Sequence, residues 1–226
     1  MIRIENFEVV GWEHAIRGMR NPKNSWDRSD SFWTYIEDPE TLETANFEFF
    51  VGDADAELMK TLAIGGSVHA KYRRMIVVFA DITAPLYWWK EFDTYKVGTV
   101  ANSCSTMHKI HAKELTLDDF SHEHLDPLSL CVLENTINNI NMNREMFVNY
   151  DQYQGGKPEK KDLWWQMIQL LPSSYNQKRT VMMNYEVLSG MYTHRKNHKL
   201  DEWKYLYQWI EELPHSDIIT TLRADV

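Results

Sequence analysis

A dense apolar run at residues 75–83 (MIVVFADIT) constrains the fold of this chain more than any other feature. Its β-branched residues and its length predict an inner strand of a sheet. Gly65 and Gly66 precede the run and Pro85 follows it, so turn signals stand at both ends. Residues 53–64, before the glycines, have a helical spacing of apolar residues and acids in the first turn. A helix followed by an inner strand predicts a fold that contains both a sheet and helices.

The rest of the chain divides into one further strand, several helices and two long polar segments. Alternating apolar and polar residues predict a strand at residues 2–10. Residues 21–46 are rich in Asn, Pro, Ser and Asp and are expected to form a long ordered loop. Residues 151–161 (DQYQGGKPEKK) are expected to be an exposed loop within one domain, because the flanking helices need partners. Apolar spacing predicts helices at residues 12–19, 86–95, 126–148, 163–171, 176–194 and 200–213, and one that begins near residue 102.

The charge balance excludes some classes of function. The chain has 226 residues, with 24 Lys and Arg against 33 Asp and Glu, so its formal net charge is −9. A non-specific binder of nucleic acid or of anionic membranes needs a basic surface, so neither is an expected partner. No run approaches about 18 apolar residues, and the first twenty residues lack the apolar core of a signal peptide. Cys104 and Cys131 are too few for a disulfide scaffold, so we expect a cytoplasmic protein.

Histidines and one cysteine raise two chemical hypotheses. His108 and His111 are three residues apart, and His122 and His124 flank an acid, but neither pair has zinc-site spacing. We therefore expect solvated histidines and no metal site. Cys104 would be a nucleophile if a helix N-terminus lowered its pKa, but a small buried thiol is the favoured interpretation.

Three further residues are candidates for ligand contacts. Asn184 and Arg195 are eleven residues apart, close to three helical turns, so a helix over this segment places them on one face. They border apolar residues, where a ligand pocket can form, although a solvated polar face is the alternative. His69, between the two glycines and the strand at residues 75–83, is either a turn residue or a ligand.

Residues 66–109 resemble the core of the flavin-dependent thymidylate synthases. In that family a helix ends in a Gly-His-rich turn, and a strand and an Ala-Pro helix start follow. Here His69 falls at the turn histidine, residues 75–83 form the strand, and Ala84-Pro85 follows without a gap. The C-terminal part resembles the family independently. Leu171-Pro172 is followed at the family's spacings by Asn184 and Arg195, and the resemblance covers about three quarters of the chain.

The family's Arg-His-Arg motif is missing. Without a gap it falls on residues 94–96 (Thr-Tyr-Lys), and with one inserted residue on residues 95–97 (Tyr-Lys-Val). In the second register Asn102 and Ser105 take the places of the motif's Asn and second Ser. The family sets this triplet against flavin and nucleotide phosphate, where one Lys cannot replace a guanidinium fork. Glu186 stands where the family usually has an Arg, and the cations that could compensate are Lys71, Arg73, Arg74 and Lys96.

The resemblance implies an α+β fold in which residues 1–226 form a single domain, with an antiparallel-type sheet packed with helices. It implies reductive methylation of dUMP to dTMP, with methylenetetrahydrofolate as carbon donor and FAD carrying reducing equivalents from NADPH. It also implies a homotetramer. Arg195 is the expected catalytic residue, which polarises a uracil carbonyl. The other expected contacts are His69, Lys96 and Asn184 to the cofactor, and Asn102 and Ser105, with Arg195, to the substrate.

Two alternatives stay open beside this activity. The first is a homologue that has lost the flavin chemistry and acts as a nucleotide-binding or structural oligomer, which the missing Arg-His-Arg motif favours. The second is an enzyme on the same scaffold with another pyrimidine substrate. Retention of Asn184 and Arg195 at the family's spacing favours an enzyme.

Overall fold

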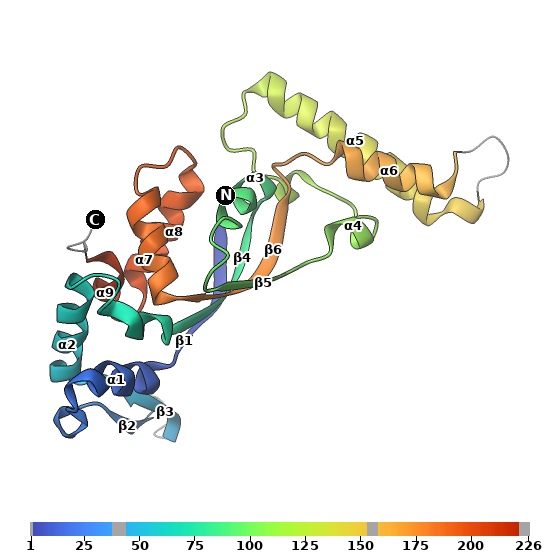
Figure 1. Cartoon of the computed structure of the whole chain (residues 1–226). Coiled ribbons are helices and arrows are strands. Elements are labelled where there is room, and N and C mark those ends of the chain that lie inside the picture. The colour runs from blue at the N-terminus through green and yellow to red at the C-terminus, as the bar shows by residue number, and fades with distance from the viewer. Residues whose placement is uncertain (1, 38–43, 153–157, 222–226) are drawn as a thin grey trace. The chain divides into compact units, whose positions relative to one another are not determined.

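The computed structural model describes residues 2–37, 44–152 and 158–221 (Figure 1). The strands are β1 (Arg3–Val10), β2 (Phe32–Glu37), β3 (Thr44–Phe50), β4 (Val77–Pro85), β5 (Thr99–Ser103) and β6 (Asn176–Asn184). The α-helices are α1 (Trp12–Arg20), α2 (Asp53–Ile64), α3 (Leu86–Phe92), α4 (Thr106–Lys109), α5 (Pro127–Val148), α6 (Lys160–Leu170), α7 (Tyr185–Arg195), α8 (Asp201–Glu212) and α9 (Asp217–Thr220). Short 3₁₀ helices are η1 (Asn21–Lys23), η2 (Trp26–Arg28), η3 (Ala70–Arg74), η4 (Leu117–Asp119) and η5 (Tyr150–Gln152).

Four of the strands form one sheet in the order β1-β4-β6-β5, and β2 pairs with β3 separately. The Tyr185 amide donates to the Ile76 carbonyl at 3.0 Å, and the Thr180 hydroxyl donates to Asp81 at 2.7 Å. Residue numbers thus fall along β4 as they rise along β6, which is the pattern of antiparallel neighbours. Since β4 has a neighbour on each side, the prediction of an inner strand is confirmed.

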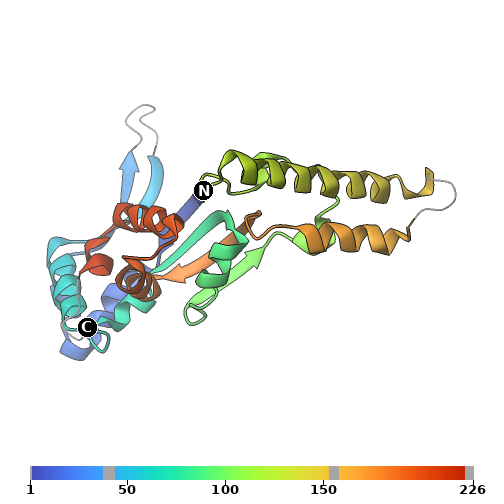
Figure 2. The same ribbon diagram turned by 90° about the horizontal axis from the view of Figure 1, so that it is seen from above.

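The described residues belong to two compact units. The first comprises residues 1–5, 81–94 and 101–180. Its long helices α5 and α6 lie side by side (Figures 1 and 2), which satisfies the need of both for a partner. A buried cluster fills the space between these helices and the segment before α5, and it consists of Ile110, Leu115, Phe120, Leu133, Ile137, Ile140 and Met167.

The second unit comprises residues 6–80, 95–100 and 181–226. Within it α7 contacts α8, α9 and η3, while α1 and α2 contact η3 and each other. Large side chains of this unit are almost completely buried, among them Ile16, Met59, Ile76, Tyr185, Leu188, Met191, Trp203 and Ile210. This unit therefore has a core of its own, to which α7 contributes Tyr185, Leu188 and Met191.

Most of the predicted helices are confirmed. The helix at residues 53–64 has the predicted bounds, and α1, α5, α6 and α8 begin or end within three residues of their predicted limits. The strand at residues 2–10 is β1. The helix predicted over residues 86–95 ends at Phe92. Of the loop expected at residues 151–161, residues 153–157 lie outside the described residues, and Lys160 and Lys161 already belong to α6.

The helix predicted over residues 176–194 is wrong for its first half. Residues Asn176–Asn184 form β6, whose backbone pairs in the sheet, and α7 begins only at Tyr185. Val181 and Met183 are buried while Met182 and Asn184 are half-buried, an alternation of period two. Asn184 then caps the helix, because its Oδ1 accepts the Val187 amide at 2.9 Å.

The long loop predicted over residues 21–46 is also wrong. It contains η1, η2 and the antiparallel pair β2–β3, with residues 38–43 outside the described part. Aromatic side chains facing each other across the strands stabilise this pair: Trp33 stacks on Phe47 with centroids 5.0 Å apart, and Phe32 lies 5.3 Å from Phe50. The helix expected to begin near residue 102 is wrong too, since Asn102 lies in β5 and α4 starts at Thr106.

Candidate functional site

Arg195, the last residue of α7, lies against two aromatic rings of the second unit. Its Nε donates a hydrogen bond to the Tyr95 hydroxyl at 3.1 Å. Its guanidinium carbon lies 5.3 Å from the ring centroid of Trp203 and 5.7 Å from that of Tyr95. These cation–π contacts and the hydrogen bond fix the orientation of the guanidinium. An oriented guanidinium is a strong donor to a carbonyl, carboxylate or phosphate oxygen.

The turn between α7 and α8 supports this cluster, which we call the Arg195 cluster (Tyr95, Arg195, His198 and Trp203). The His198 amide donates to the Arg195 carbonyl at 2.9 Å, and His198 Nδ1 accepts the Leu200 amide at 3.1 Å. Trp203 is buried in the first turn of α8, with its ring edge-on to His198 and to Tyr95. The rings that hold Arg195 are therefore themselves held by packing and by the turn.

Tyr207 adds a neutral hydroxyl near the Arg195 cluster. Burial raises the pKa of Tyr207 well above its ordinary value, the nearby Tyr95 raises it further, and the Arg195 charge opposes this rise. Tyr207 therefore keeps its proton at neutral pH, and Arg195 gains no anionic partner from it.

Asn184 lies at the opposite end of α7 from Arg195. Eleven residues of α-helix rise about 16 Å, so the two side chains cannot contact one small chemical group. Asn184 is a helix cap, and Gly98 packs closely against it. A Cβ at Gly98 would lie 2.7 Å from Asn184 Nδ2, and Gly98 has a φ of +83°. Asn184 and Arg195 thus mark the two ends of α7.

His69 and Lys96, the other predicted cofactor contacts, are exposed residues of the same unit. The His69 imidazole lies against Gly65, and its amide donates to the Gly66 carbonyl at 3.1 Å. Lys96 makes no hydrogen bond or ion pair with any residue in the described ranges. Their roles toward a cofactor stay predictions.

Asn102 and Ser105, the predicted substrate contacts, belong to the first unit. Both are exposed, Asn102 within β5 and Ser105 directly before α4. The Ser105 side chain makes no capping hydrogen bond to α4. The substrate-binding role of these two residues also stays a prediction.

Arg73, one of the four cations named above as replacements for the missing arginines, is buried in the core. Its side chain is fully buried, and its Nε lies 3.0 Å from Glu186 Oε2. Its Nη1 donates to Ser189 Oγ at 3.1 Å and to the Ile218 carbonyl at 2.8 Å. Glu186, which stands where the family has an Arg, thus balances a buried arginine. Arg73 is unavailable to a phosphate, whereas Lys71 and Arg74 are exposed.

The other chemical hypotheses find little support. Among the described residues no three His, Cys, Asp or Glu side chains gather in a group that could hold a metal ion. Both thiols are free and exposed, so the interpretation of Cys104 as a buried thiol is wrong. Tyr95 was not predicted as the partner of Arg195, although both registers of the family motif pass through this residue.

Comparison with solved structures assigns the fold. The chain is similar to thymidylate synthase X from Helicobacter pylori in a crystal structure with FAD and dUMP, with a TM-score of 0.62 and 14% identity over 97% of each chain. A second structure of that enzyme complexed with FAD and dUMP gives a TM-score of 0.61 and 15% identity, over 97% of this chain and 96% of the other. No protein-family model and no curated protein sequence matches.

The chain therefore has the fold of the flavin-dependent thymidylate synthases. The α+β class with an antiparallel sheet and packed helices is confirmed. The resemblance read from the motifs is confirmed at the level of the fold. The prediction that residues 1–226 form one domain stays a prediction. No helix in the described ranges has the length and apolar character needed to cross a bilayer.

Proposed function

We propose that this protein binds a uracil nucleotide, dUMP or a close relative, and catalyses reductive methylation at carbon 5 of its base. The one-carbon unit would come from methylenetetrahydrofolate, and FAD would supply reducing equivalents from NADPH. The observation that carries the proposal is the orientation of Arg195 by Tyr95 and Trp203 in a chain with a thymidylate synthase fold.

Arg195 has the chemistry that carbon 5 alkylation requires. Carbon 5 of uracil becomes strongly nucleophilic when a hydride or another nucleophile adds at carbon 6, because this addition forms an enolate with negative charge on the oxygen of carbonyl 4. A guanidinium already held in place can donate hydrogen bonds to that oxygen without reorganising, which favours the transition state over the ground state. Tyr95 and Trp203 hold the guanidinium, so they are positioning residues in this mechanism.

The residues present do not fit an FAD diphosphate bound in the family's manner. Both arginines of the family motif are replaced, Lys96 supplies one ammonium group, and Arg73 is enclosed with Glu186. One ammonium does not offer the paired, planar donors of two guanidinium groups. In this proposal Arg195 recognises the pyrimidine, and a flavin would need contacts that differ from the family's.

The same observation favours a second candidate function. A homologue without flavin chemistry would keep the fold and the Arg195 cluster and act as a nucleotide-binding or structural oligomer. An enzyme with another pyrimidine substrate would also keep the Arg195 cluster. A nucleotide-binding homologue without flavin chemistry predicts nucleotide binding that does not depend on FAD.

The experiment that separates these functions is the visible absorption spectrum of the purified protein, before and after excess FAD is added and unbound FAD removed. Retention of about one flavin per subunit, followed by dUMP-dependent oxidation of the reduced flavin, supports the synthase. No retained flavin, in a protein shown to be folded by circular dichroism, contradicts it and leaves the second candidate.

We also propose a homotetramer in the cytoplasm, because the family builds its sites between subunits of such an assembly. Light scattering during size-exclusion chromatography measures the assembly directly. A mass near 107 kDa, four times the 26.8 kDa chain, is expected. A monomer at micromolar concentration would contradict the proposed assembly.

A further inference from the structure

The segment that joins α1 to β2 forms one wall of a cavity of about 440 Å³ in the second unit. Its lining residues are Arg20, Lys23, Asn24, Ser25, Asp27, Arg28, Ala54 and Leu58. We propose that this cavity binds the phosphate group of a small phosphate monoester. The proposal does not rest on the proposed function, because none of the lining residues belongs to the Arg195 cluster.

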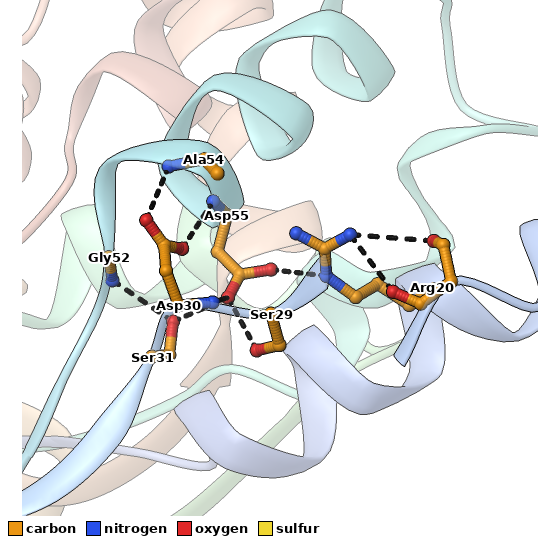
Figure 3. A network of polar contacts seen from close by, with 8 residues as sticks. Arg20, Ser29, Asp30, Ser31, Gly52, Ala54 and Asp55 are labelled. Carbon is orange, nitrogen blue, oxygen red and sulfur yellow. Dashed lines mark hydrogen bonds and ion pairs between the residues drawn. The ribbon is translucent and has the colours of Figure 1, made fainter. Parts of the chain in front are cut away.

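Arg20 is a buried cation whose position is fixed by the protein. Its side chain is 5% exposed, and its Nε pairs with Asp55 Oδ1 at 2.6 Å (Figure 3). Its Nη1 donates to the Ser25 carbonyl at 3.2 Å and to Ser25 Oγ at 3.4 Å. Asp55 is held in turn by the hydroxyl groups of Ser29 and Ser31, both at 2.7 Å. The guanidinium therefore has one orientation before any ligand binds.

One nitrogen of Arg20 is left without a partner in this arrangement. Nη2 donates no hydrogen bond to any residue in the described ranges, and Figure 3 shows it without a dashed line. Nη2 is not fully enclosed by the protein, and Arg20 lines the cavity, so an acceptor in the cavity can reach this nitrogen. A buried guanidinium nitrogen with access to a cavity is a donor for an acceptor that enters it.

Two more cations line the cavity. The side chains of Lys23 and Arg28 are exposed, and neither makes a hydrogen bond or ion pair with a residue in the described part of the chain. Asp55 neutralises Arg20 at its Nε, and Asp27 is the one carboxylate among the lining residues. Cations from three positions, with donors unused by the protein, suit an anion that has several oxygens and more than one charge. A phosphate monoester has both.

The wall that carries these cations is ordered by its own backbone. Amides of Asn24, Ser25, Arg28 and Ser29 donate to the carbonyls of Asn21, Arg20, Ser25 and Trp26, at 3.1–3.4 Å. Asn24 takes the left-handed conformation, with a φ of +45°, which reverses the chain between η1 and η2. The first turn of α2 is already occupied, since Asp30 accepts the Ala54 and Asp55 amides at 2.8 and 3.1 Å. The proposed site thus depends on side-chain cations and not on the helix terminus.

The size of the cavity indicates a ligand larger than free phosphate. About 440 Å³ falls within the range typical of small-molecule sites, whereas a phosphate ion alone would leave most of it to water. Leu58 and Ala54 provide an apolar side against which the organic part of a monoester can lie. The expected ligand is therefore a phosphorylated metabolite of modest size.

Isothermal titration calorimetry on the full-length protein tests the proposal, with ribose 5-phosphate as the monoester, dimethyl phosphate as the diester, inorganic phosphate, and ribose as the neutral control. Ribose 5-phosphate is expected to bind most tightly and ribose not at all, and the affinity should fall as salt is raised. Equal binding of the monoester and the diester, or no binding of either, overturns the proposal.

Variants locate the binding to this cavity. Lys23→Gln and Arg28→Gln are each expected to weaken binding of ribose 5-phosphate about five- to tenfold, and Asp27→Asn to strengthen it, because a repelling charge is removed. Lys90→Gln, at an exposed lysine of the first unit, is the matched control and should change nothing, as should Arg195→Gln. Unchanged affinity for ribose 5-phosphate in both cavity variants, or loss of binding in Arg195→Gln alone, overturns the proposal and leaves the proposed function untouched.

Discussion

Replacement of Asp55 by Asn tests how much the buried ion pair of Arg20 and Asp55 stabilises the second unit. Asp55 is completely buried and accepts hydrogen bonds from Arg20 Nε, Ser29 Oγ, Ser31 Oγ and the Asp30 amide (Figure 3). Asp55→Asn keeps the size of the side chain but removes the charge, so Arg20 is left as a buried cation without a counter-ion. Breaking a buried pair in this way costs about 3–5 kcal/mol. In a chain of this length it corresponds to a fall in melting temperature of about 6–20 °C.

The assay is urea unfolding followed by circular dichroism, with Asp53→Asn as the matched control. Asp53 lies two residues away in the first turn of α2, is exposed, and its side chain has no partner among the described residues. Its replacement is expected to change the free energy of unfolding by less than about 0.5 kcal/mol. If Asp55→Asn and Asp53→Asn lower the free energy of unfolding by the same amount, the ion pair does not stabilise the unit.

The pH dependence gives a second test of Asp55. Burial raises the pKa of Asp55, but hydrogen bonds from Ser29 and Ser31 and the charge and hydrogen bond of Arg20 outweigh it, so the pKa is lowered. A folded-state pKa below the unfolded-state value gives stability that is present above about pH 4 and lost as the pH falls through the folded-state pKa. The difference in stability between the wild type and Asp55→Asn should therefore shrink below about pH 4. A constant difference between pH 7 and pH 3 would contradict this assignment.

Three further predictions concern backbone, cap and thiols. Gly98→Ala should lower the free energy of unfolding by about 1–3 kcal/mol, because its Cβ would meet Asn184 and its φ is positive. Gly190→Ala, with open space at its Cβ, should raise the free energy of unfolding by up to about 1 kcal/mol. Chemical denaturation measures both changes, and equal effects of the two variants would contradict the geometry. Asn184→Ala should cost about 1 kcal/mol in the same assay, because α7 loses its cap, and no loss would show that the cap is not needed. Cys104 and Cys131 should both react with a thiol reagent in the folded protein, and protection of either would contradict its exposure.

Local signals in the sequence predicted the elements whose ends are marked by their own residues. The acids at the start of α2 and the glycines after it define its limits, and Asp126 caps α5 through the Ser129 amide at 2.8 Å. The dense run at residues 75–83 similarly predicted β4. In each case the residues that determine the element lie within it or next to it.

Two elements that depend on partners far along the chain, β6 and the hairpin β2–β3, were not predicted. Residues 176–184 contain helix-compatible Gln, Lys and Met, but pairing with β4 and β5 makes them a strand. The hairpin β2–β3 depends on aromatic contacts between residues such as Trp33 and Phe47, on separate strands. The polar composition of the segment before it concealed these contacts.

In the candidate site, likewise, one residue was predicted from the sequence and its distant partner was not. The resemblance to the family singled out Arg195, but its partner Tyr95 is a hundred residues earlier and became apparent only in the fold. Arg73 and Glu186 are also far apart in the sequence. Their ion pair explains why an acid can stand where the family has an Arg. Spacing alone contains no information on such contacts.

Calorimetric titration of dUMP into the wild type and Arg195→Lys tests recognition of a uracil nucleotide through Arg195. We expect saturable binding to the wild type and a loss of about tenfold or more in affinity in the variant, because a lysine has neither the planar fork nor the Tyr95 contact. Failure of folded wild-type protein to bind dUMP, or equal affinity in both proteins, would contradict it.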